Sequence, residues 1–154
     1  MTKSTALVTG GAGFIGSNLA DALLAEGSAV HVVDDLSHGQ VVRVPAAAEF
    51  HERDIRDSAG LLAIAQAARP SVIYHLAAQA DVRRALDEPS FDADVNIIGT
   101  IAVLEAAHAV EGLERDGHIP GAATQVENHI ARLRRDLSYQ CASPRPLSYR
   151  HRER

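Results

Sequence analysis

The first 112 residues alternate between short apolar runs and longer stretches in which apolar residues recur every three or four positions. Short apolar runs bounded by Gly, Pro or Asp are typical of buried strands, and they occur here at 4–9, 29–33 and 71–76. Residues 49–52 form a weaker candidate for a third strand. Helical spacing predicts helices over 14–25, from Asp57 or Ser58 to Pro70, and over 91–109. Strands that alternate with helices in this order are characteristic of a parallel sheet with crossover helices.

We therefore predict an α/β fold for residues 1–112, the N-terminal part of a doubly wound, Rossmann-like parallel sheet that is incomplete. After Gly112 the pattern ends, and residues 113–154 form an atypical basic tail without an apolar run of strand length. Residues 124–137 could form a helix, because four apolar residues share one face and Thr124 and Glu127 fit a capping box. The remaining proline- and arginine-rich residues are predicted to be disordered.

Composition and charge narrow the class of protein. The chain has 154 residues, 46% of them hydrophobic and 23% charged, which is ordinary for one globular domain. The net charge of −5 divides into −8 for residues 1–112 and +3 for residues 113–154, and the acidic part argues against nucleic-acid binding. A single cysteine, Cys141, favours a reducing cytoplasm. No apolar run approaches the ~18 residues that span a bilayer, so we expect no membrane segment.

A glycine-rich segment joins the first predicted strand to the first predicted helix: Thr9-Gly10-Gly11-Ala12-Gly13-Phe14-Ile15-Gly16. Gly10 permits a sharp turn, Gly13 lets the backbone approach a pyrophosphate, and Gly16 lets the helix pack closely on the strand. Phe14 and Ile15 begin the helix, whose free N–H groups and positive dipole end face the phosphates. The pattern predicts a dinucleotide site, and the alternative is a purely structural glycine turn.

Asp34 ends the second predicted strand. A carboxylate at this position accepts hydrogen bonds from the ribose hydroxyls of adenosine and repels a 2′-phosphate, which favours NAD over NADP. The alternative is a solvated loop carboxylate. Asp35 is ambiguous, because two adjacent carboxylates cannot both point at one ribose.

Five motifs together resemble a known family: the glycine-rich segment above, Asp34-Asp35-Leu36-Ser37, Asp54-Ile55-Arg56-Asp57, His75-Leu76-Ala77-Ala78-Gln79 and Asn96-Ile97-Ile98-Gly99-Thr100. Their order is similar to that in the NAD-dependent epimerase/dehydratase family of the extended short-chain dehydrogenase/reductase superfamily. Within it, they resemble the N-terminal part of the UDP-glucose 4-epimerase and nucleotide-sugar dehydratase group. The resemblance covers residues 4–112.

The resemblance implies roles for further residues. Asp54 and Ile55 would flank the adenine, with the Asp54 carboxylate accepting from its amino group. Leu76, Ala77 and Ala78 would line the nicotinamide side of NAD, although small core residues would produce the same sequence. Asn96 would contact the cofactor region, and a structural hydrogen-bond partner is the alternative for a polar residue inside an apolar helix.

The histidines suggest no separate chemistry at this stage. His75 lies on a predicted buried strand, where a packed, hydrogen-bonded histidine is expected rather than a catalytic base. The other histidines are scattered without metal-ligand spacing, so the sequence predicts no metal site.

The catalytic pair that the resemblance implies is absent from this sequence. Members of the superfamily use a Tyr-x-x-x-Lys pair for proton exchange with the sugar, and the lysine lowers the pKa of the tyrosine. The positions four residues after the three tyrosines hold Ala78, Ser143 and Glu153, and the only lysine is Lys3. We therefore predict no catalytic residue, and whether the chain is an enzyme stays open.

Two functions remain under consideration. In the first, the chain is the NAD-binding portion of a nucleotide-sugar epimerase or dehydratase, truncated or frameshifted after residue 112. It would then bind a nucleotide sugar only if the missing half were supplied, and its uncovered sheet would favour self-association. In the second, an authentic short protein senses a dinucleotide without catalysis and uses the basic tail to contact a partner.

Overall fold

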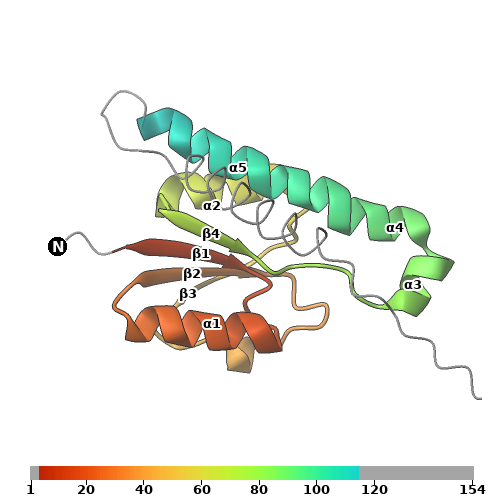
Figure 1. Cartoon of the computed structure of the whole chain (residues 1–154), viewed down its shortest axis with the longest axis horizontal. Helices are drawn as coiled ribbons and strands as arrows, with labels where there is room; N and C mark the ends of the chain where they lie inside the picture. Colours follow the sequence, from red (N-terminus) through yellow and green to blue (C-terminus); the bar gives the residue numbers. More distant parts are fainter. Residues whose placement is uncertain (1–3, 115–154) are drawn as a thin grey trace, which may run out of the picture. The chain divides into compact units, whose positions relative to one another are not determined.

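A computed structural model describes residues 4–114, which contain a four-stranded, fully parallel sheet (Figure 1). The strands lie in the order β3-β2-β1-β4, with β1 (Thr5–Thr9) and β2 (Ala29–Asp34) in the middle and β3 (Glu49–Glu52) and β4 (Val72–His75) at the two edges. All four strands match the predicted runs, which confirms the α/β, Rossmann-like fold class.

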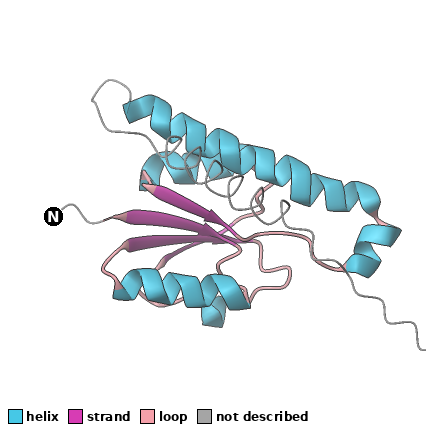
Figure 2. Cartoon of the chain, viewed as in Figure 1, coloured by secondary structure: helices cyan, strands magenta, loops and turns pink. Residues whose placement is uncertain are grey.

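The helices follow the predicted order, and the structure adds further turns (Figure 2). The helical elements are α1 (Phe14–Ala25), η1 (Val41–Arg43), α2 (Ser58–Ala68), α3 (Val82–Asp87), α4 (Pro89–Ala93), the π-helical η2 (Asp94–Ile98) and α5 (Gly99–Glu114). Asp57 caps α2 by accepting a hydrogen bond from the Gly60 N–H. The sequence analysis missed α3, because its exposed apolar residues form no buried stripe and its stability comes from the Asp81 cap.

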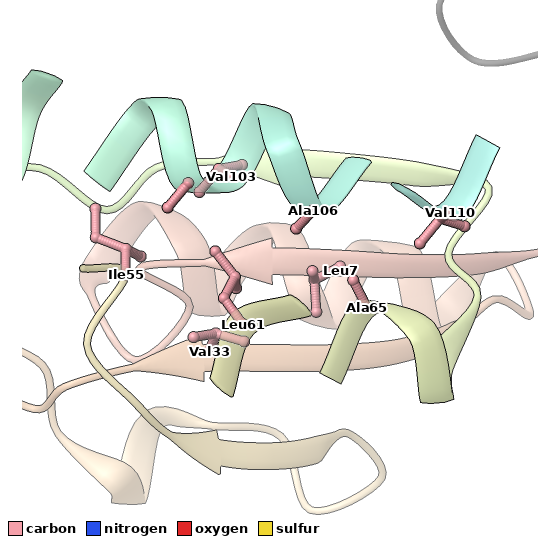
Figure 3. Packing of buried hydrophobic residues seen from close by; sticks show 9 residues of the cluster. Leu7, Val33, Ile55, Leu61, Ala65, Val103, Ala106 and Val110 are labelled. Carbon is pink, nitrogen blue, oxygen red and sulfur yellow. The ribbon is translucent and has the colours of Figure 1, made fainter. Parts of the chain in front are cut away.

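The sheet is covered on both faces, and each face has its own core. Helix α1 lies over one face, on a cluster that includes Val8, Val30 and Val32. Helices α2 and α5 pack on each other and cover the opposite face (Figure 1). The core between them contains Leu7, Val33, Ile55, Leu61, Ala65, Ala102, Val103, Ala106 and Val110 (Figure 3).

The long helical stretch departs from two expectations. Helix α5 continues through Gly112 to Glu114, two residues beyond the predicted domain boundary, and the predicted helix over 124–137 lies outside the described residues. We expected no segment that could span a membrane, but Pro89–Val110 is long and apolar enough to do so by length and composition alone. Its inner face packs on the sheet core through Val103 and Ala106, as expected for a core helix.

The packing between α2 and α5 generates a stability prediction. Leu61→Ala removes a side chain with no exposed surface, so we expect the free energy of unfolding to fall by about 2–5 kcal/mol. Leu104 on α5 is 60% exposed, so the matched Leu104→Ala variant should change stability by less than about 0.5 kcal/mol. Urea denaturation followed by circular dichroism measures both. Equal losses for the two variants would contradict the packing described here.

Candidate functional site

The carboxyl ends of the strands converge on one cavity of about 160 Å³. The predicted site residues that line it are Gly10, Asp34, Asp35, Asp54, Ile55, Leu76, Ala77 and Ala78. Open α/β sheets bind ligands at this edge. Complete small-molecule sites enclose ~300–1,000 Å³, so the described residues enclose only part of a dinucleotide site.

Steric contacts account for two glycines of the loop between β1 and α1. Gly10 has a positive φ of 71°, and a Cβ there would lie 2.6 Å from the Ala77 nitrogen. A Cβ at Gly16 would overlap the Gly10 carbonyl oxygen and lie 2.6 Å from the Gly11 Cα. Both glycines are therefore required by the packing of the protein itself: Gly10 against the backbone after β4, and Gly16 against the backbone of the loop.

Gly13 is less crowded than these two glycines. A Cβ there would meet only the Gly10 carbonyl oxygen, at 3.3 Å, and the φ of Gly13 is an ordinary −77°. Gly13 is the N-cap of α1, and because glycine has no side chain, the first N–H groups of the helix receive no cap hydrogen bond from this residue. The Phe14 and Ile15 side chains are apolar and 75% and 69% exposed. An anion at the start of α1 could therefore be bound by the backbone N–H groups of these residues and not by their side chains.

The Asp34 carboxylate fastens the glycine-rich loop to the end of β2. Its Oδ2 accepts a hydrogen bond from the Ala12 N–H at 3.0 Å, and its Oδ1 accepts from the Leu36 N–H at 2.8 Å. The residue is only 7% exposed, yet it lines the cavity. Because each carboxylate oxygen has a second lone pair, Asp34 retains acceptor capacity towards the cavity. A solvated loop carboxylate, the alternative considered above, does not describe this residue.

Asp35 is organised differently from its neighbour. It is exposed, and its Oδ1 accepts from both the N–H and the hydroxyl of Ser37, at 3.0 and 2.6 Å. These contacts shape the loop after β2 and direct one oxygen away from any ligand. Asp34 is therefore the better placed of the two carboxylates to accept from a sugar hydroxyl.

Asp54 forms an ion pair with Arg56. The Arg56 Nε donates to both Asp54 oxygens at 3.0 Å, and this hydrogen bonding lowers the pKa of Asp54 despite partial burial. The Arg56 guanidinium also lies 5.0 Å from the centroid of Phe91, and Arg84 covers the same ring at 3.6 Å. Asp54 is thus held ionised at the wall of the cavity, where it can act only as an acceptor.

The apolar predicted residues occupy two positions around the cavity. Ile55 is 5% exposed, and it packs so closely on α5 that a Cβ at Gly99 would lie 2.6 Å from its Cδ1. Leu76, Ala77 and Ala78 follow β4, and the backbone there is in contact with Gly10. All four residues line the cavity.

Asn96 has structural partners and is not among the residues that line the cavity. Its Oδ1 accepts from the Gln79 N–H at 2.8 Å, and its Nδ2 donates to the Gln79 carbonyl at 2.9 Å. Asp92 accepts from both side-chain amides, of Gln79 and Asn96. This network joins the segment after β4 to α4 and η2, which supports the structural alternative for Asn96; contact with a cofactor stays a prediction.

His75 is the packed, hydrogen-bonded histidine that the sequence predicted. The Leu76 N–H donates to the Thr9 hydroxyl oxygen, which leaves the Thr9 proton for His75 Nδ1 at 2.7 Å. His75 Nε2–H then donates to the Thr100 hydroxyl, which donates to the Asn96 carbonyl. Burial lowers the pKa of His75, so the ring is neutral and joins β1, β4 and α5.

The cavity also contains residues that sequence reasoning did not select: Ser37, His38, Gly39, Arg53, Gln79, Arg84, Phe91 and Val95. The sequence contained a signal for some of these residues. Ser37, His38 and Gly39 follow the carboxyl end of β2, and Arg53 directly precedes the predicted site residue Asp54. Arg84 had no such signal, because α3 was not predicted, and the predicted helix over 91–109 did not indicate that Phe91 faces the cavity.

Comparison with known proteins agrees with this geometry. The chain is 49% identical over 106 residues to UDP-glucose 4-epimerase of Mycolicibacterium smegmatis, covering 66% of this chain and 34% of that protein. It is 35% identical over 126 residues to GDP-mannose 4,6 dehydratase 2 of Caenorhabditis elegans, covering 73% and 33%. The chain therefore spans about a third of the length of the curated relatives it matches.

Solved structures match with a TM-score of 0.67. One is UDP-glucose 4-epimerase of Thermotoga maritima with UDP-glucose, 44% identical, covering 69% of this chain and 34% of that one. Another is UDP-glucose 4-epimerase of Thermus thermophilus in complex with NAD, 40% identical, covering 70% and 34%. The family model for GDP-mannose 4,6 dehydratase matches residues 7–124. By its motifs, its sheet and this match, the chain belongs to the GDP-mannose 4,6 dehydratase family of NAD-dependent epimerases and dehydratases.

Proposed function

We propose that this chain is the NAD-binding portion of a nucleotide-sugar epimerase or dehydratase and has no catalytic activity by itself. The observation that carries the proposal is the buried Asp34 carboxylate, which faces the cavity beside the glycine-rich loop. The similarity to epimerases crystallised with NAD supports the same cofactor.

The cavity and the glycine-rich loop fit a dinucleotide. Gly13, Phe14, Ile15 and Gly16 do not line the cavity itself, but the absence of a side chain at Gly13 lets a pyrophosphate approach the backbone there. The α1 N-terminus beside it supplies backbone N–H donors and the positive end of a helix dipole. Asp34 would accept from the adenosine ribose, Asp54 and Ile55 would flank the adenine, and Leu76, Ala77 and Ala78 would border the nicotinamide side.

The chemistry of the family needs more than binding. NAD supplies hydride transfer to and from the sugar when it is bound. A protein group must then move a proton on the sugar hydroxyl, and this sequence has no Tyr-x-x-x-Lys pair for that task. His75 does not replace it, because both of its ring nitrogens are hydrogen-bonded to threonine hydroxyls.

Several partner assignments remain predictions. We expect no nucleic-acid or membrane partner, a cytoplasmic location, self-association through the uncovered edge of the sheet, and a nucleotide-sugar substrate only if another polypeptide completes the site. The alternative function, a dinucleotide sensor that uses a basic tail, depends mainly on residues outside the described range.

The first prediction concerns the choice of cofactor. We expect NAD and ADP-ribose to bind with similar, weak affinity, because the described residues form the adenosine and pyrophosphate side more completely than the nicotinamide side. NADP should bind at least about tenfold more weakly, because its 2′-phosphate meets the Asp34 carboxylate. Isothermal titration calorimetry with the three ligands measures this, and tighter binding of NADP would contradict it.

The matched variants Asp34→Asn and Asp35→Asn separate the two adjacent carboxylates. Asp34→Asn keeps one of the two hydrogen bonds from the Ala12 and Leu36 N–H groups and removes the charge, so the affinity ratio between NAD and NADP should approach one. Asp35→Asn should leave most of that ratio in place, because Asp35 is exposed and bonded to Ser37. The reverse order of effects would assign the ribose to Asp35.

The second prediction concerns turnover. The purified chain should not epimerise or dehydrate UDP- or GDP-sugars, because loss of the general acid–base pair alone costs ~10²–10⁴-fold in rate. Incubation with NAD and each sugar, followed by chromatography of the products, tests this. Steady turnover that Gly13→Val abolishes would overturn the proposal, since Gly13→Val blocks the pyrophosphate approach without any packing conflict comparable to Gly16.

A further inference from the structure

Two histidines and a glutamate gather on the edge of the sheet, on strands β2 and β3. His31 pairs with Glu49 in the parallel register, and His51 lies two residues further along β3, so the three side chains share one face. The exposed fractions of the side chains are 16% for His31, 20% for His51 and 65% for Glu49. The two histidine side chains are therefore mostly buried, whereas the Glu49 side chain is mostly exposed to solvent.

The potential ligand atoms of the three residues lie close together: with one atom taken from each residue, all are within 4.8 Å of one another. His31 Nδ1 lies 3.2 Å from His51 Nε2 and 3.5 Å from Glu49 Oε2, and Glu49 Oε1 lies 3.7 Å from His51 Nε2. Tetrahedral zinc has Zn–N distances of ~2.0–2.1 Å and Zn–O distances of ~2.0–2.2 Å, which place neighbouring ligand atoms about 3.3 Å apart. The distance of 3.2 Å between the two histidine nitrogens is close to this value, and each nitrogen lies 3.5–3.7 Å from one oxygen of the Glu49 carboxylate.

We propose that His31, Glu49 and His51 bind one divalent transition-metal ion of the zinc type, with the fourth coordination position open to solvent. Two imidazoles and one carboxylate suit Zn²⁺, Co²⁺, Ni²⁺ and Cu²⁺. The same set is poor for Mg²⁺ and Ca²⁺, which require oxygen ligands. Each histidine coordinates as a neutral ring, through Nδ1 of His31 and Nε2 of His51.

The two histidine rings lie against each other on the neighbouring strands β2 and β3. They are 10° from parallel with centroids 5.5 Å apart, so the rings must turn for both lone pairs to point at one ion. In the structure, His31 Nδ1 and His51 Nε2 are 3.2 Å apart and form a hydrogen bond in which one of the two nitrogens carries the proton.

The position of the cluster indicates what the ion does. Strand β3 is the edge of the sheet and has only four residues, so few ladder hydrogen bonds hold it. An ion joined to both β2 and β3 would fasten this edge close to the strand ends that carry Asp34 and Arg53, two residues that line the cavity. The inference is independent of the proposed function, because no residue of the cluster lines that cavity.

Metal titration of the full chain tests the proposal. Calorimetry with ZnCl₂ and NiCl₂ should give one ion per chain, and MgCl₂ or CaCl₂ at the same concentration should give no binding. The absorption spectrum with Co²⁺ should show the intense visible bands of tetrahedral coordination. His51→Gln and the exposed Glu49→Gln should each weaken Zn²⁺ binding by at least about tenfold, since even the loss of an outer-shell partner costs that much.

Control variants separate this site from the other potential ligands of the chain. His108→Gln replaces an exposed histidine on α5 and should not change the affinity. A combined variant with His118→Gln, His129→Gln, His151→Gln and Cys141→Ser should keep the one-ion stoichiometry and the Co²⁺ spectrum. The proposal is overturned if the combined variant abolishes binding, if His51→Gln and Glu49→Gln both retain it, or if the native chain binds no zinc. An unchanged circular dichroism spectrum of each variant ensures that lost binding is not lost folding.

Discussion

The arrangement of the candidate site depends on the close approach of three backbone segments at the carboxyl edge of the sheet. Gly10 turns the chain off β1 with its Cα facing the Ala77 backbone, and α1 is so near that Gly16 has no room for a side chain. The Asp34 carboxylate then holds the same loop from the β2 side through the Ala12 N–H. Each of these segments therefore excludes a side chain from the next, and the loop is held from the β2 side and from the β4 side.

A second set of contacts orients the other wall of the cavity. The hydrogen bonds run from Thr9 through His75 and Thr100 to the Asn96 carbonyl, and the Asn96 side chain continues them to the Gln79 backbone. The chain of donors and acceptors is complete only with a neutral His75 ring, which its burial favours. The segment after β4 is therefore fixed by polar contacts, whereas the segment after β1 is fixed by sterics.

The local parts of the fold and site were predictable because their causes are local. Buried strands, the Asp57 cap and the glycine spacing follow from chemistry within a few residues, and each of them appears in the structure. The family resemblance added Asp54 and Leu76, whose positions around the cavity depend on topology. Helix α3 and the Arg84–Phe91 contact were missed, since exposed residues of mixed polarity carry no periodic signal. The histidine cluster was missed because its partners are eighteen and twenty residues apart, and only strand register brings them together.

Binding and chemistry have different requirements in this chain. The groups that approach a pyrophosphate and a ribose belong to β1, α1 and β2, and those elements are complete, internally packed and hydrogen-bonded. A catalytic acid–base pair requires two further side chains on one helical face, and the sequence has a single lysine, which precedes β1. The described residues therefore support the proposed binding of a dinucleotide, whereas the given sequence contains no Tyr-x-x-x-Lys pair for the proposed reaction on the sugar.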